Sequence, residues 1–119
     1  LLGELAQRLV RTLCNECKEL HQVDASELTL LGQIDPSTQI FRPKGCDKCS
    51  YSGYRGRTGI HELLEVNEIV REMIHSGTSE LEVERYARTI SPGIRSDGMS
   101  KVLSGLTSLE EVLRVTREE

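Results

Sequence analysis

The chain has 119 residues, the length of one ordinary domain, and carries 15 lysine and arginine residues against 19 aspartate and glutamate residues. Its contents of 37% hydrophobic and 29% charged residues suit a folded domain and exclude a disordered tail. It contains no apolar run near the length of about 20 residues that a membrane span needs, and its N-terminus lacks the pattern of a signal peptide, so we expect a cytoplasmic location.

The first segment, residues 1–13, is predicted to form an amphipathic helix that leads directly to Cys14. Its apolar residues recur three and four positions apart, with charged residues between them. These apolar residues are Leu2, Leu5, Ala6, Leu9, Val10 and Leu13. A second, short helix is expected over residues 25–31, because Asp24 is a suitable N-cap and Gly32 can end the helix. A loop is expected from there to the next motif.

All four cysteines stand in two Cys-x-x-Cys motifs, Cys14 with Cys17 and Cys46 with Cys49, with 28 residues between the pairs. Each motif places two thiolates on one side of a tight turn, and two such turns form the tetrahedral sulfur site that zinc prefers. Four sulfur ligands leave no position for water, so the site is expected to be structural. We therefore predict a zinc-binding lobe over residues 14–49. Disulfide or redox use is less favoured in the cytosol, and iron on the same sulfurs stays open.

The remainder of the chain is predicted to begin with a short β segment over residues 50–66, where β-branched and apolar residues alternate. Residues 67–119 are predicted to form a helical bundle of about four helices. The expected helix starts are Asn67, Ser79, Asp97 and Thr107 or Ser108, and the expected stops are Gly77, Pro92 and Gly105. Thr107 and Ser108 each lie three residues before a glutamate, as a capping box requires. The fold class expected overall is α+β, mainly helical.

A basic stretch spans residues 42–57, which contain five basic residues and a single acidic one, Asp47. Three interpretations stay open: a solvated face that offsets the thiolate charge, a contact to phosphate or acidic lipid headgroups, or a contact to an acidic protein. The basic residues are Arg42, Lys44, Lys48, Arg55 and Arg57.

The three histidines are not expected to act chemically. His21 follows Cys17 closely enough to be an alternative ligand, but four cysteines already complete the site. His61 and Glu62 are neighbours on a predicted strand and therefore point to opposite faces. His75 lies near a helix C-terminus, where the helix dipole favours it.

The sequence also lacks a phosphate-binding loop and the common local hydrolase motifs, so we expect no enzyme activity from this chain alone.

Three strings are similar to a single family: LAQRLVRTLC over residues 5–14, CDKC over 46–49 and GYRGRTGIHELL over 53–64. They resemble the C-terminal region of the type II secretion ATPases, the general secretion pathway protein E family, and less closely the type IV pilus assembly ATPases. The strings IRSDG over 94–98 and TSLEEVLRVT over 107–116 resemble the same family.

This resemblance implies that the chain is the C-terminal fragment of a RecA-like motor. Such motors are cytoplasmic hexamers, bound peripherally to platform proteins of the inner membrane, that couple ATP hydrolysis to pseudopilus assembly and protein export. The resemblance implies Zn²⁺ on Cys14, Cys17, Cys46 and Cys49, with ATP and Mg²⁺ bound upstream of this chain. It also implies a nucleotide contact from Arg57 in the whole protein. Homo-hexamer neighbours and platform proteins would be the partners, with an acidic lipid contact also open.

Two further functions compete with this interpretation. A zinc-ribbon nucleic-acid binder is favoured by the basic stretch, but a net charge of −4 and an aromatic content of only 3% argue against nucleic acid as a partner. A thiol redox enzyme needs a reactive cysteine at a helix N-terminus, whereas Cys14 is predicted to follow a helix.

Overall fold

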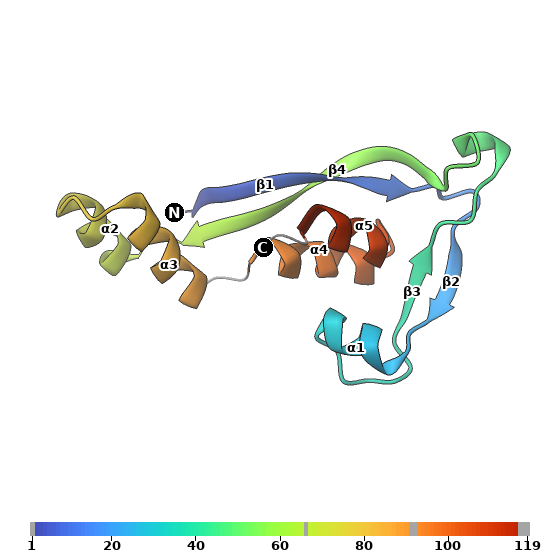
Figure 1. Ribbon diagram of the computed structural model, residues 1–119, viewed down its shortest axis with the longest axis horizontal. Coiled ribbons are helices and arrows are strands. Elements are labelled where there is room, and N and C mark those ends of the chain that lie inside the picture. Colours follow the sequence, from blue (N-terminus) through green and yellow to red (C-terminus); the bar gives the residue numbers. More distant parts are fainter. Residues whose placement is uncertain (1, 66, 91–92, 117–119) are drawn as a thin grey trace.

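A long antiparallel ribbon of two strands runs through the molecule (Figure 1). In the computed structural model, which describes residues 2–65, 67–90 and 93–116, the ribbon consists of β1 (Leu2–Leu13) and β4 (Tyr54–Glu65). Leu2 pairs with Glu65 and Leu13 with Tyr54. The expected β segment is therefore confirmed as one strand of 12 residues. The parts of our predictions that involve Leu1, Val66, Pro92 and residues 117–119 lie outside the described residues.

The helix predicted over residues 1–13 is wrong, since this segment is strand β1. Val10 and Leu13 are both buried three positions apart, a spacing typical of a helix. A shift in register between Arg11 and Leu13, such as a β-bulge produces, allows both side chains to reach the core from one strand. Leu9, on the expected apolar face, is 53% exposed. Pairing with the long strand β4 stabilises β1 more than helix formation would, because a short helix is only marginally stable by itself.

A second, smaller sheet lies between the two cysteine motifs. It pairs β2 (Glu19–Gln22) with β3 (Gln39–Arg42) in antiparallel fashion, and β3 lies in the segment expected to be a loop. Between these strands, α1 (Ala25–Leu31) confirms the short helix. The N-cap Asp24 forms a capping box with Glu27, and Gly32 adopts the left-handed conformation that ends the helix.

The helices after β4 form two separate pairs, so the prediction of one bundle over residues 67–119 is wrong. The first pair, α2 (Glu68–His75) and α3 (Glu80–Ile90), lies at one end of the ribbon (Figure 1). The second pair, α4 (Ile94–Leu103) and α5 (Leu109–Thr116), packs against the middle of the ribbon. α4 and α5 bury their apolar side chains against the ribbon, and not against α2 and α3 as they would in one bundle.

The α+β class is confirmed over the described residues, with five α-helices, one short 3₁₀ turn at Asp47–Cys49 and two two-stranded sheets. Asn67 caps α2 as expected. α4 begins earlier than the predicted Asp97, at Ile94. None of the helices in the described ranges has the length and apolar character required to cross a membrane.

The core lies between the ribbon and the second helix pair, and it extends to α1 and β3. Its central side chains are completely or almost completely buried. They are Val10, Ile60, Ile94, Met99, Val102 and Val112, joined by Val23, Leu31 and Ile40 from the segment between the cysteine motifs. Packing against the core therefore fixes where that segment lies.

Gly98 of α4 lies directly against Val112 of α5, which leads to a prediction about packing. A Cβ atom at this position would lie 2.5 Å from Cγ1 of Val112. We expect Gly98→Val to lower the free energy of unfolding by about 1–3 kcal/mol, the usual cost of overpacking a core. Urea unfolding at neutral pH measures this cost. Gly93→Ala is the control, because a Cβ there meets no atom within 4 Å. Equal stability of the two variants would contradict the prediction.

Candidate metal centre

The two Cys-x-x-Cys turns lie side by side where the two sheets meet. Cys14 directly follows β1 and Cys17 precedes β2, while Cys46 follows β3 and Cys49 ends the 3₁₀ turn before β4. The backbone N–H of Cys14 donates to the carbonyl of Gly53 at 2.9 Å, which joins the two turns. The strand ends therefore bring together four thiols from two distant parts of the sequence.

The sulfur atoms have the spacing of a tetrahedral metal site. All four Sγ atoms lie within 4.8 Å of one another. Cys14 and Cys46, Cys17 and Cys49, and Cys46 and Cys49 are each separated by 3.8 Å between sulfurs. A regular tetrahedron with metal–sulfur bonds of about 2.3 Å has edges of about 3.8 Å. All four cysteines are free thiols, so the donor set fits a single thiophilic ion such as Zn²⁺.

Backbone N–H groups point at two of the sulfurs. Gly45 donates to Sγ of Cys17 at 3.3 Å, and Cys46 and Gly53 donate to Sγ of Cys49 at 3.3 and 3.2 Å. Hydrogen bonds of this kind stabilise thiolates, the form that binds metal. Burial by itself raises the pKa of Cys49, but these two N–H groups, together with the thiols of Cys17 and Cys46, outweigh burial and lower that pKa to about 6.

Cys17 behaves in the opposite way in the protein without an ion. Burial raises the pKa of its thiol to about 11, despite the N–H group of Gly45. Since metal binds the thiolate, binding at Cys17 must release the proton of this thiol.

Gly53 allows the second turn to run directly into β4. Its φ is +86°, and a Cβ atom there would lie 2.4 Å from Cβ of Pro43. Ser50 and Tyr51 also have positive φ values, of 55° and 63°, which tightens the turn further. Only glycine fits at residue 53, because both the backbone conformation and the close approach exclude a side chain.

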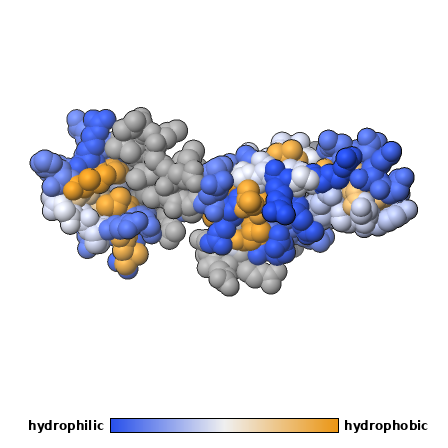
Figure 2. All heavy atoms as spheres, turned by 90° about the horizontal axis from the view of Figure 1, so that it is seen from above, coloured by the Kyte–Doolittle hydropathy of each residue, from blue (hydrophilic) through white to orange (hydrophobic). Residues whose placement is uncertain are grey.

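Of the remaining predicted site residues, Arg57 is exposed on β4 and pairs in register with Arg11. Arg42 forms an ion pair with Glu19 at 2.9 Å, which offsets part of the charge of the basic stretch. Lys44, Lys48 and Arg55 are exposed. Figure 2 shows the end of the molecule with the cysteine turns mostly in hydrophilic colours.

The histidines do not join the sulfur cluster. Nε2 of His21 contacts the carboxylate of Glu27 at 2.9 Å, in keeping with four cysteines forming the complete ligand set. The backbone N–H of His61 donates to Oδ2 of Asp97 at 2.8 Å.

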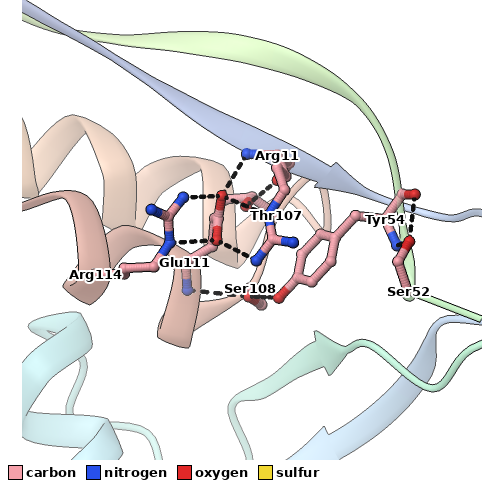
Figure 3. Close-up of polar contacts among 7 residues, drawn as sticks. All are labelled: Arg11, Ser52, Tyr54, Thr107, Ser108, Glu111 and Arg114. Carbon is pink, nitrogen blue, oxygen red and sulfur yellow. Dashed lines mark hydrogen bonds and ion pairs between the residues drawn. The ribbon is translucent and has the colours of Figure 1, made fainter.

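Sequence reasoning missed a second polar centre, built around Glu111 of α5 (Figure 3). Its carboxylate is 1% exposed and accepts hydrogen bonds from the backbone N–H, Nε and Nη2 of Arg11 at 2.8, 3.1 and 3.0 Å. It also accepts bonds from Nε and Nη2 of Arg114, at 3.1 and 2.9 Å. Burial raises the pKa of Glu111, but the two guanidinium groups outweigh burial and lower it to about 2.

The only sequence signal for this centre was the capping box expected at Ser108. Half of that box is present, since Oγ of Ser108 accepts a bond from the backbone N–H of Glu111 at 3.2 Å. The carboxylate of Glu111 instead turns toward Arg11, 100 residues earlier in the chain. The guanidinium of Arg11 also lies over the ring of Tyr54, 4.2 Å from its centroid.

Comparisons with known proteins match one family over nearly the whole chain. The family model described as "Type II/IV secretion system protein" matches residues 1–114. Type II secretion system protein E of Aeromonas hydrophila is 55% identical over 100% of this chain, which covers 24% of that protein. The type II secretion system ATPase E of Vibrio cholerae is 52% identical over 99% of this chain, again 24% of its length.

A more distant relative is the type IV pilus assembly ATPase PilB of Thermus thermophilus, which is 41% identical over 99% of this chain and of which the chain covers 14%. The chain thus spans about a quarter of the length of the type II secretion relatives it matches.

Proposed function

The chain belongs to the type II/IV secretion system protein family, and we propose that it is the C-terminal, zinc-containing module of a type II secretion ATPase. The sequence contains no phosphate-binding loop, and the chain covers 24% of its type II relatives. We assign it a structural and interaction role, with ATP hydrolysis carried out by the rest of the protein. The observation that carries this proposal is the tetrahedral spacing of the four sulfurs, with separations of 3.8 Å.

Bound Zn²⁺ would link the four sulfurs, and its coordination would be complete, with no position open for water or substrate. The protein's own part is to present these sulfurs from two turns and to direct backbone N–H groups at Cys17 and Cys49. The ion would thereby hold the ends of both sheets together, and the geometry suits a structural site.

For the whole protein we propose a cytoplasmic hexameric motor at the inner membrane that drives pseudopilus assembly and protein export. Membership of the family and the names of the relatives support this proposal. Neighbouring subunits and platform proteins would then be its partners. Arg57, exposed on β4, is available for the proposed nucleotide contact, and the exposed basic residues near the cysteine turns are available for acidic lipid.

Nucleic-acid binding has less support than this role. Arg42 is neutralised by Glu19, and the chain carries a net charge of −4.

Metal analysis of the purified chain tests the proposal. Elemental analysis after purification under reducing conditions is expected to find one zinc ion per chain. Four thiols should become reactive toward a thiol reagent only after a strong chelator has removed the ion. Iron in place of zinc would be recognised by its visible absorption and would correct the metal assignment. A folded chain with four reactive thiols and no metal would contradict the proposal.

A further inference from the structure

We propose that the metal centre controls the order of the turn between α4 and α5, residues 104–108, which we call the α4–α5 turn. This inference rests on the proposed metal site and goes beyond a local structural role. Residues flanking both cysteine motifs contact the turn directly, and they reach it from two sides.

The first set of contacts comes from residues flanking Cys14 and Cys17. Nζ of Lys18 donates to the carbonyl of Gly105 at 2.9 Å. The backbone N–H of Leu13 donates to the carbonyl of Leu106, also at 2.9 Å. Oγ1 of Thr107 donates to the carbonyl of Arg11 at 2.7 Å. Three successive residues of the turn are thus bound to backbone and side-chain atoms close to the first cysteine motif.

Phe41 of β3, which precedes the second motif in the chain, also packs against the turn. Gly105 has a φ of +81°, and a Cβ atom there would lie 3.0 Å from Cδ2 of Phe41. Nζ of Lys18 lies 4.5 Å from the centroid of the same ring. The aromatic ring therefore packs against the turn and against the lysine that holds it, and a cation–π contact adds to the hydrogen bond.

The second set of contacts starts at Cys49 and reaches the end of the turn. Figure 3 shows its part from Ser52 through Tyr54 to Ser108. Oγ of Ser52 donates to the carbonyl of Cys49 at 2.8 Å and accepts from the backbone N–H of Tyr54 at 3.1 Å. The hydroxyl of Tyr54 lies 2.6 Å from Oγ of Ser108, which in turn accepts from the N–H of Glu111. Hydrogen bonds at the backbone and at the hydroxyl of Tyr54, linked by its side chain, therefore connect Cys49 to the N-terminus of α5.

The two motifs contribute to these contacts only while their positions are fixed. Without an ion the two turns lose the link between their sulfurs and keep only contacts such as the hydrogen bond from Cys14 to Gly53, so residues next to them gain freedom. Lys18 and Tyr54 would then hold the α4–α5 turn less firmly. The α2–α3 pair lies at the other end of the ribbon and should not respond (Figure 1). Loss of the ion is therefore expected to loosen the α4–α5 turn and the start of α5 without loosening α2 and α3.

Hydrogen exchange of the chain with and without bound zinc tests the proposal. The N–H of Leu106, which donates to the carbonyl of Lys101, and the N–H of Val112, which donates to that of Ser108, report on the turn and on α5. After removal of zinc by a chelator, we expect both amides to exchange on the order of tenfold faster. The N–H of Ser76, the C-cap of α2, is bound to the carbonyl of Glu72 and is expected to change less than about twofold.

A double variant, Lys18→Met with Tyr54→Phe, removes the contacts of Lys18 with Gly105 and of Tyr54 with Ser108 and retains all four cysteines. It is expected to bind one zinc ion, to exchange fast at Leu106 even when zinc is bound, and to respond little to the chelator. Lys48→Met is the matched control. Lys48 lies between the two cysteines of the second motif, and its exposed side chain is not part of these contacts. The control should behave as the parent chain does.

The outcomes separate this inference from the proposed function. Zinc binding with no change at Leu106 and Val112 on chelation would overturn the inference and leave the metal site intact. Fast exchange at Ser76 as well would also overturn it, because it would show unfolding of the whole chain. Absence of zinc from the folded parent chain would overturn the proposed function, and the inference with it.

Discussion

Replacing Cys46 with serine is expected to abolish tight zinc binding and to unfold the lobe over residues 14–49. Cys46 contacts the sulfurs of both Cys14 and Cys49 at 3.8 Å, so its loss removes one of four ligands and opens the site. Binding of structural zinc contributes roughly 10–16 kcal/mol in small zinc domains, far more than a small lobe gains from packing. Packing of Val23, Leu31 and Ile40 into the core, with single contacts such as that of Lys18 with Gly105, would then have to keep the lobe in place.

Limited proteolysis combined with zinc analysis measures this effect. New cleavage is expected between the two motifs, while α2 and α3 keep their resistance because they pack mainly on each other. Asp47→Asn is the matched control, since it changes an exposed residue between two ligands and leaves all four sulfurs in place. Unchanged zinc content or unchanged protease resistance in Cys46→Ser would contradict the prediction.

The sequence predicted those features that depend on neighbouring residues. Two Cys-x-x-Cys motifs define their own turns, so the clustering of the four cysteines was predicted without knowledge of the fold. Asp24 and Asn67 cap the helices that follow them, because a cap acts on backbone groups only three residues away. Such local interactions are the same whatever the remainder of the chain does.

The sequence did not predict features that depend on distant partners. The spacing of Val10 and Leu13 is typical of a helix, but it arises from the register shift in a strand whose partner begins at Tyr54. Glu111 looked like a capping residue, yet its carboxylate is held by Arg11 across 100 residues. No local pattern marks either interaction, since strand pairing and ion pairing are decided by tertiary contacts.

The largest electrostatic effect is expected from removing both arginines that hold Glu111, in the double variant Arg11→Met with Arg114→Met. In the parent chain the pKa of Glu111 is about 2, below its ordinary value of 4.5. A carboxyl whose pKa is lower in the folded state stabilises the fold above pH 4.5, and this contribution is lost as the pH falls toward 2. The double variant leaves a buried carboxylate with neither guanidinium group. We expect this change to cost about 3–5 kcal/mol at neutral pH.

The dependence on pH should also change sign at this site. With both arginines gone, burial is the largest remaining influence, and burial raises the pKa of a carboxyl above its unfolded value. The penalty is then greatest at high pH and is relieved as the carboxyl becomes protonated. Urea unfolding between about pH 8 and pH 5 should therefore show the stability gap between the parent chain and the double variant narrowing as the pH falls.

Two further variants isolate the cause. Arg71→Met with Arg85→Met removes the same charge from exposed positions on α2 and α3, and should give a small gap that does not vary with pH. Adding Glu111→Gln to the double variant removes the stranded charge but keeps an acceptor for the backbone N–H of Arg11. This triple variant should recover much of the lost stability at neutral pH. A gap that stays constant with pH, or no recovery with glutamine, would show that the arginines act through packing, because only an unpaired carboxylate makes their loss depend on protonation.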